Sequence, residues 1–144
     1  MRNKSGFTIY ELMIVMAIVA ILASIAIPNY FAWLPKQRLK NAAADLQSNM
    51  QHARLVAVKE NASCTVSFNL ADDSYTVPCL DKTINLSQYD PSVTFSAVDA
   101  TGQITFTSRG MTTGNNMFNI IIANDNDAFN IRVSPAGAIV SRGL

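Results

Sequence analysis

The sequence predicts an α+β protein in which a long N-terminal helix, first transmembrane and then amphipathic, packs on a distal antiparallel β-sheet domain. Three observations support this fold class. Residues 12–35 carry no charge, and a helix of about 20 apolar residues spans a bilayer core. Residues 36–59 repeat apolar side chains at helical spacing. Residues 61–144 alternate apolar and polar side chains in short runs separated by turn signals.

Composition excludes several classes of function. The 144 residues allow one domain plus an anchor, and the formal charge of +1 gives no general basic field for nucleic acid. One His and two Cys offer no zinc or haem spacing. The sequence shows no Ser/His/Asp or Cys/His constellation either. We therefore expect a protein that is not an enzyme and that holds no metal or cofactor.

The first turn of the apolar run contains a carboxylate, Glu11. An anion at the edge of a hydrocarbon segment is costly and usually functional. A short basic leader, residues 1–6, precedes it. An ordinary secretory signal would be cut after its apolar core, and Ala23–Ala26 offers such a site. The length of the apolar run and the position of Glu11 argue against that reading.

The stretch Gly6-Phe7-Thr8-Ile9-Tyr10-Glu11, with the apolar run and Pro28 behind it, resembles the type IV prepilin signature from Lys4 to about Tyr30. The resemblance implies cleavage after Gly6 by a prepilin peptidase of the inner membrane. It also implies N-methylation of Phe7 and retention of the apolar helix. The alternative is a plain signal anchor.

Cleavage after Gly6 would create a charge pair. It would remove Arg2 and Lys4, change the formal charge from +1 to −1, and leave a cationic amine on Phe7. That amine and Glu11 are four residues apart, within reach of each other on one helix. In a filament, the amine of one subunit and Glu11 of a neighbour would compensate two desolvated charges. We predict that Glu11 sets the register of assembly.

These features divide the chain into a leader (1–6), a transmembrane or filament-core helix (7–34), an amphipathic helix half (35–60) and a distal β-rich domain (61–144). Pro28 and Pro35 cannot donate the helical hydrogen bond, so kinks or local melting are expected there. Pro35 could instead begin a second helical segment.

The amphipathic half carries one apolar face, which is expected to pack on the sheet: Leu39, Ala42, Ala43, Leu46, Met50, Ala53 and Ala57. His52 lies off this face and is expected at the surface. The basic cluster Lys36, Arg38 and Lys40 is interpreted as a solvated collar just outside the membrane, with contact to anionic lipid head groups as the alternative.

A hairpin is predicted around residues 70–73. Two alternating runs flank this loop, and a symmetric register places Phe68 opposite Tyr75 and Cys64 opposite Cys79. Directly opposite, non-hydrogen-bonded residues have Cα atoms about 4.5 Å apart, which is within disulfide range. We therefore predict a Cys64–Cys79 bridge and an oxidising compartment. The alternative is two buried thiols.

Further strands are predicted at residues 93–97, 104–106, 118–122, 129–133 and 138–140, with turns between them. The segment Asn124–Asp127 shares part of the pattern of a calcium loop but lacks its glycine and distant glutamate. We interpret it as a polar hairpin turn.

Several stretches resemble the H-type minor pseudopilins, which include type II secretion subunits and FimT-like minor pilins. They are residues 37–39, 42–43, 46–47, 51–54 and 57–58 in the helix, residue 61 just after it, and residues 104–106, 109–110 and 132–137 further along the distal part. The resemblance implies a minor subunit that initiates, caps or enters a type IV pilus or type II secretion pseudopilus. Its partners would be other pilin subunits, reached through the N-terminal helix, and the distal domain would lie in the periplasm.

Some FimT-like members bind DNA through a Gly-Arg-x-Arg motif near the C-terminus. Here the matching stretch is Gly137-Ala138-Ile139-Val140, and both arginines are missing. Because DNA contact needs clustered cations and residues 61–144 are net acidic, the sequence disfavours DNA as a partner. Besides the DNA-binding minor pilin, the alternatives are a major pilin and a bitopic membrane protein that does not polymerise. The mid-chain cysteine pair disfavours the major pilin.

Overall fold

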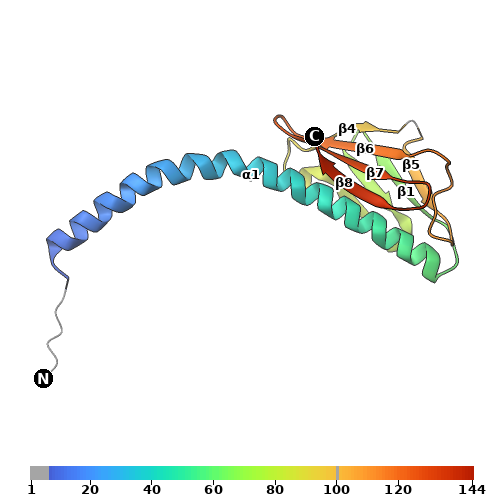
Figure 1. Ribbon diagram of the computed structural model, residues 1–144, viewed down its shortest axis with the longest axis horizontal. Helices are drawn as coiled ribbons and strands as arrows, with labels where there is room; N and C mark the ends of the chain where they lie inside the picture. Colours follow the sequence, from blue (N-terminus) through green and yellow to red (C-terminus); the bar gives the residue numbers. More distant parts are fainter. Residues whose placement is uncertain (1–6, 100) are drawn as a thin grey trace, which may run out of the picture. The chain divides into compact units, whose positions relative to one another are not determined.

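The computed structural model describes residues 7–99 and 101–144, so the leader and Gly6 lie outside it. The described chain forms two compact units, residues 7–34 and residues 35–144. The helix α1, Ile9–Lys59, contributes to both units (Figure 1).

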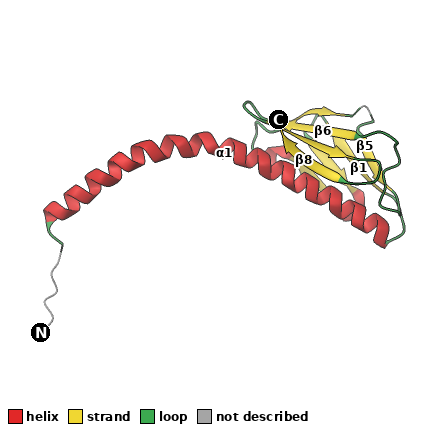
Figure 2. Cartoon of the chain, in the orientation of Figure 1, coloured by secondary structure: helices red, strands yellow, loops and turns green. Residues whose placement is uncertain are grey.

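The first unit consists of the N-terminal part of α1, which is apolar on all sides. The helix is unbroken through Pro28 and Pro35 (Figure 2). The expected local melting is therefore wrong, and Pro35 does not begin a separate helix. A proline removes one hydrogen bond from the ladder and clashes with one preceding carbonyl. A helix of 51 residues keeps its remaining bonds and continues past both positions. A kink at either proline stays a prediction.

The second unit combines the rest of α1 with two four-stranded antiparallel sheets (Figure 1). One sheet has the order β3-β2-β1-β5, with β1 Cys64–Asn69, β2 Ser74–Val77, β3 Lys82–Asn85 and β5 Gln103–Phe106. The other has the order β4-β6-β7-β8, with β4 Thr94–Val98, β6 Phe118–Ala123, β7 Ala128–Val133 and β8 Ile139–Gly143. Two 3-10 turns, Pro78–Leu80 and Leu86–Gln88, flank β3.

The predicted apolar face of the helix is confirmed. The buried residues of α1 are Leu39, Ala42, Ala43, Leu46, Met50, Ala53 and Ala57, and they join one core with side chains of both sheets. Four of the seven are alanines, whose short side chains let the helix approach the sheets closely. His52 is exposed, as predicted.

The hairpin register is confirmed at its centre and wrong at its end. Phe68 pairs with Tyr75 and Ser67 with Thr76. The strand β2 stops at Val77, however, and Cys79 lies in the 3-10 turn. Pro78 cannot donate a hydrogen bond to a strand ladder and so ends the strand. Cys64 and Cys79 are therefore not strand partners.

The later strands follow the prediction, since β4 to β7 lie within one residue of the predicted runs at each end, whereas β8 starts one residue later and continues three residues beyond its predicted end. The short strand β3 was not predicted. Its sequence, Lys-Thr-Ile-Asn, offers a single apolar residue, Ile84, so it carries no alternation to detect. Its pairing with β2 from Ser74↔Asn85 to Val77↔Lys82 makes it a strand.

Candidate functional site

A reciprocal pair of hydrogen bonds closes the start of α1. Both the backbone N–H and the hydroxyl of Thr8 donate to Oε2 of Glu11, at 3.0 and 3.1 Å. The backbone N–H of Glu11 donates to the Thr8 hydroxyl oxygen at 3.2 Å. This is a capping box, in which a residue before the helix and one in its first turn satisfy each other's free N–H groups. The carboxylate also lies where the helix dipole favours negative charge.

The role of Thr8 was missed by sequence reasoning, although the signal was present. The pattern Thr8-Ile-Tyr-Glu11 is the Thr-x-x-Glu signature of a capping box. Phe7, the expected new N-terminus, is 87 % exposed beside this cap.

The apolar part of α1 is long and apolar enough to cross a membrane, with a mean hydropathy of 2.4 in an 18-residue window that is not buried within the protein. The exposed large side chains run from Ile9 to Trp33. A helix that is apolar all round needs lipid or other helices to cover it.

A disulfide joins Cys64 at the start of β1 to Cys79 in the 3-10 turn, with Cα atoms 5.8 Å apart. Both positions match the sequence prediction, although the local geometry differs. The bridge holds the turn that follows β2 against the first strand. Cys64 is buried in the core and Cys79 is packed against it, so the bridge secures the middle of the second unit.

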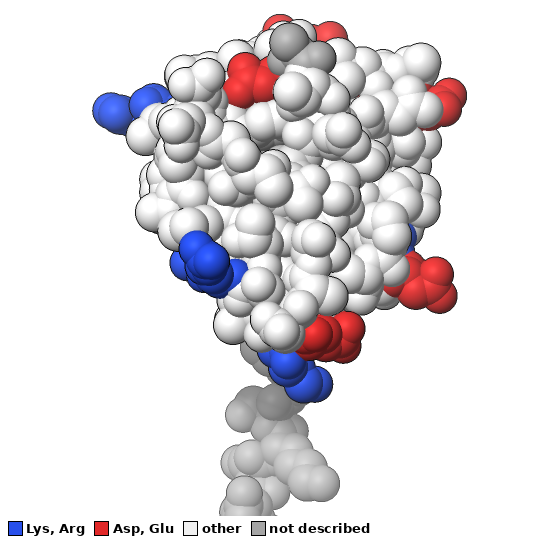
Figure 3. Space-filling model, turned by 90° about the vertical axis from the view of Figure 1, so that its right-hand side faces the viewer, with Lys and Arg blue, Asp and Glu red and all other residues white. Residues whose placement is uncertain are grey.

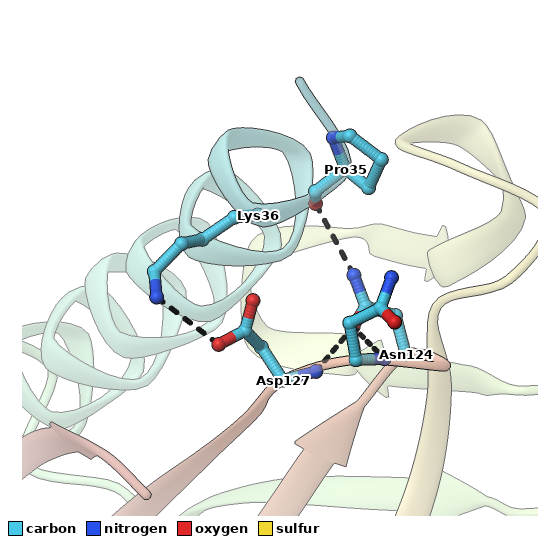
Figure 4. A network of polar contacts seen from close by, with 5 residues as sticks. Pro35, Lys36, Asn124 and Asp127 are labelled. Carbon is cyan, nitrogen blue, oxygen red and sulfur yellow. Dashed lines mark hydrogen bonds and ion pairs between the residues drawn. The ribbon is translucent and has the colours of Figure 1, made fainter. Parts of the chain in front are cut away.

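The basic collar is engaged by acidic residues of the distal part. Lys36 Nζ lies 3.1 Å from Oδ1 of Asp127, and Arg38 lies 2.7 Å from Oδ2 of Asp90. Asn124 donates to the carbonyl oxygen of Pro35 at 3.3 Å (Figure 4). The side chains of Lys36 and Arg38 are nevertheless 59 % and 44 % exposed, so the collar is solvated as predicted, and the ion pairs add to that interpretation. Sequence reasoning missed these pairs because the partners lie 91 and 52 residues away.

Asp90 is the more enclosed of the two acidic partners, with its side chain 14 % exposed. The backbone N–H and hydroxyl of Ser92 donate to its other oxygen at 2.9 and 2.8 Å. The hydrogen bonds from the Ser92 backbone and from Arg38 lower the pKa of Asp90 to about 2. In the folded protein, the Asp90 carboxylate is therefore charged at neutral pH.

Two tyrosines fasten the helix to the distal part on another side. Asn49 donates to the hydroxyl of Tyr75 at 2.9 Å, and the hydroxyl of Tyr89 donates to Asp45 at 2.7 Å. Burial raises the pKa of Tyr75 to about 12. Burial and the bond to the Asp45 carboxylate raise the pKa of Tyr89 as well. Both hydroxyls therefore keep their protons.

Arg54 connects the helix to two loops. Its Nε donates to the carbonyl oxygen of Gly110 at 2.7 Å, and its Nη2 donates to that of Ala136 at 3.3 Å. Gly110 and Gly137 both have positive φ, at 73° and 78°. A Cβ on Gly137 would collide with the Gly110 carbonyl oxygen, so the two loops meet here with no room for a side chain.

The stretch that matches the DNA-binding motif contributes to the core. Gly137 lies in the β7–β8 turn and Ile139 is buried, while Val140 is exposed. Figure 3 shows Lys and Arg residues apart from one another, with acidic residues and wide uncharged areas between them, on the face that it presents. Among the described residues, no three His, Cys, Asp or Glu side chains gather as a metal site would require.

Two families match the sequence. Residues 42–137 match GspH, described as type II transport protein GspH. Residues 1–27 match the prokaryotic N-terminal methylation motif. The first match covers about two thirds of the chain, and it contains Arg54, Gly110, Gly137 and the disulfide.

Curated relatives are pilins. A fimbrial protein from Pseudomonas aeruginosa is 33 % identical over 84 residues, which are 58 % of this chain and 54 % of that protein. The type IV major pilin protein PilA from Myxococcus xanthus is 47 % identical over 47 residues, which are 33 % of this chain and 21 % of that protein. The chain thus spans about half the length of the fimbrial protein, and less of PilA.

A solved structure shares the fold. The type IV minor pilin FimU from Pseudomonas aeruginosa superposes with a TM-score of 0.62 at 15 % identity, over 76 % of this chain and 92 % of FimU. The same pilin in a second crystal form gives a TM-score of 0.58. The pilin fold predicted from the sequence is therefore confirmed. Together with the match over residues 42–137, the methylation motif and the capped, apolar α1, this places the chain in the GspH family of type II transport proteins.

Proposed function

We propose that the protein is a minor subunit of a type IV pilus or type II secretion pseudopilus, which helps to initiate or cap the filament or is incorporated into it. The observation that carries this function is the exposed apolar half of α1, which begins at the capped carboxylate of Glu11. Such a helix needs a bilayer before assembly and neighbouring helices after it. Membership of a pseudopilin family supports the same assignment.

The capping box suggests how the Glu11 carboxylate is stabilised both in the membrane and in the assembled filament. In the membrane, Thr8 supplies two hydrogen bonds to Oε2 of Glu11 and so offsets part of the cost of its charge. A carboxylate accepts further bonds through its second oxygen. In the filament, Oε1 would receive the N-terminal amine of Phe7 from a neighbouring subunit. The ion pair is then completed without loss of the helix cap.

Processing and location follow from the same proposal. A prepilin peptidase would cut after Gly6 and methylate Phe7, which the match to the methylation motif supports. The apolar helix would cross the inner membrane, with residues 35–144 in the periplasm. The disulfide supports an oxidising compartment for these residues. In the filament, the partners would be other pilin subunits, reached through the N-terminal helix.

A major-pilin role is the second candidate, because PilA of Myxococcus xanthus and the type IV wide pilus major component PilA4 of Thermus thermophilus are among the relatives. Those matches cover 47 and 32 residues, respectively. The GspH match instead covers residues 42–137, which include most of the distal part. Counting copies of the chain in sheared filaments separates the two roles. A minor subunit is present at a small fraction of the main subunit.

Three substitutions test the function of the capped carboxylate. Glu11→Gln removes the charge but keeps a side chain that completes a capping box. Thr8→Val removes the cap hydroxyl but keeps the charge, and Glu11→Ala removes both functions of Glu11. We expect all three to be cleaved after Gly6, as shown by mass spectrometry of the N-terminus. We expect both Glu11 variants to be absent from filaments, whereas Thr8→Val enters them at a reduced level.

Two results would contradict the proposal. A wild-type chain that keeps Met1, or that begins after Ala26, is not a processed prepilin. Normal incorporation of Glu11→Gln would show that assembly does not need the charge, even if the helix cap matters.

A further inference from the structure

The two sheets protect three of their four edges. The backbone N–H of Phe95 on β4 donates to the carboxylate of Asp73 at 2.8 Å. On β5, the N–H of Thr113 donates to the carbonyl oxygen of Thr105 at 3.1 Å, so a loop covers that edge. The edge strand β3 has four residues and carries Lys82. Short, charged or covered edges are the usual defences against strand pairing.

The edge of β8 is open along its second half. Ser134 N–H donates to Ala138 O, and Leu144 N–H donates to Ala128 O, both at 2.9 Å. These bonds set the alternation of an antiparallel pair, so the peptide groups of Ile139, Ser141 and Gly143 point away from β7. Gln47 from the helix donates to Ile139 O at 3.4 Å. Residues 140–144 are all exposed, and among the described residues no further backbone group binds the outward peptide groups of Ser141 and Gly143.

A groove lies beside the start of β8. It has a volume of about 570 Å³ and lies between the exposed side of α1 and the β5–β6 and β7–β8 loops, with Ile139 as the one residue of β8 in its lining. Leu55 and Val58 of its lining are 66 % and 49 % exposed. Arg54 and Arg109 are its charged lining residues, and its lining contains no carboxylate. The groove therefore suits an apolar side chain that lies near an acidic one.

We propose that the β8 edge and this groove accept an extended segment of a neighbouring filament subunit by strand addition. The inference rests on the proposed function, because it takes its partner from the same filament. The outward peptide groups of Ser141 and Gly143 would bind the backbone of the added strand. An apolar side chain of the segment would lie against Leu55 and Val58, and a carboxylate beside Arg109.

The exposed side chains of β8 define the segment further. Val140 and Arg142 lie on the same face of the strand, because side chains two residues apart share a face. Residues directly opposite them on an added strand are also two apart. The segment should therefore carry an apolar residue and, two positions away, an Asp or Glu that pairs with Arg142.

Ser141→Pro tests the backbone part of the proposal in the full-length chain, produced together with the other subunits. The substitution removes an N–H that points away from β7, so no bond within the sheet is lost, and edge strands tolerate proline in this orientation. Ser141→Ala is the matched control, since it removes the side-chain bond to Gln47 but keeps the N–H. We expect Ser141→Pro to lower the number of copies per filament about tenfold, corresponding to about 1.4 kcal/mol. Ser141→Ala should leave it within about twofold.

A second pair of variants tests the groove independently of β8. Leu55→Glu places a charge on the apolar lining, whereas Ser48→Glu adds the same charge at an exposed position of α1 outside the lining. We expect Leu55→Glu to reduce incorporation and Ser48→Glu to leave it unchanged. Thermal unfolding of each purified chain in detergent shows whether the variant is folded. Hydrogen exchange at Ser141 and Gly143 should slow on assembly of the wild type.

The outcomes separate the two proposals. If the wild type enters filaments and Ser141→Pro and Leu55→Glu enter equally well, with unchanged exchange at Ser141, strand addition is wrong and the proposed function stands. If the wild type does not enter filaments at all, both proposals are wrong.

Discussion

Arg54 Nε donates a 2.7 Å hydrogen bond to the carbonyl oxygen of Gly110, a residue 56 positions further along the chain. The same guanidinium reaches the carbonyl oxygen of Ala136. Arg54 thus brings together three of the stretches that resemble pseudopilins. They are residues 51–54, 109–110 and 132–137. Their common role is to fasten the β5–β6 and β7–β8 loops to the helix.

Gly137→Ala should destabilise the protein strongly. Gly137 has a φ of 78°, which costs a non-glycine residue about 1–2 kcal/mol, and the added Cβ would also collide with the Gly110 carbonyl oxygen. We expect the free energy of unfolding to fall by at least about 2 kcal/mol, measured by denaturant unfolding of the full chain. Gly114→Ala is the control, because a Cβ there meets no atom within 4 Å. Equal stability of the two variants would show that the loop junction is loose.

Removing the disulfide should lower stability by a similar amount. The bridge closes a loop with a sequence separation of 15, which is worth about 3 kcal/mol in the loop-entropy account. We expect the double variant Cys64→Ala, Cys79→Ala to unfold at correspondingly lower denaturant. Thiol titration of denatured, unreduced wild type should find no reactive thiol. Two reactive thiols would mean that the bridge does not form in the cell.

Leu46→Ala should lower the free energy of unfolding far more than the same substitution at an exposed leucine of α1. Leu46 is fully buried between α1 and the sheets, and truncation of a buried leucine costs about 2–5 kcal/mol. Leu55→Ala, at a position 66 % exposed, should change the free energy of unfolding by less than about 0.5 kcal/mol. Chemical unfolding of both variants measures the difference. A large loss at Leu55 would place that side chain in the core of the single chain.

Asp90 should make the protein less stable in acid. Its pKa is lowered to about 2 in the folded state, whereas an unfolded Asp has a pKa of about 3.9. The unfolded chain therefore binds the proton first as the pH falls, and stability is lost from about pH 5 down to about pH 2. Across this range, the free energy of unfolding should fall less steeply for Asp90→Asn than for the wild type. The exposed Asp125→Asn should follow the wild type, and an unchanged slope for Asp90→Asn would remove this carboxylate as a source of acid sensitivity.

DNA binding should be weak and unspecific. Arg132 on β7 and Arg142 on β8 line one surface hollow, and the described residues of its lining include no third cation. Two cations are few for contact with phosphates, and seven Asp residues lie in the same distal part. We expect a gel-shift assay of the full chain in detergent to show no complex at physiological salt. A complex that survives at high salt would show a site that these charges do not explain.

The sequence by itself determined the features that depend on local pattern. Side chains that are close together in the chain predicted four features. They are the apolar run, the helical spacing of Leu39 to Ala57, the alternation of β4 to β8 and the position of Glu11. Periodicity reports which face of an element is buried, so it predicted the helix face that packs on the sheets. It also placed the two cysteines near each other through a hairpin, because their sequence separation is only 15.

The tertiary structure alone decided which distant residues meet. Lys36 and Asp127 lie 91 residues apart in the sequence. The residues around each of them do not predict that the two will pair. The same is true of Arg54 and the carbonyl groups of Gly110 and Ala136, to which its guanidinium donates. The open edge of β8 likewise depends on how the strands are ordered, because an edge is a property of a sheet and not of a strand. Side-chain periodicity contains no information on these contacts, which arise only when the loops close on the helix.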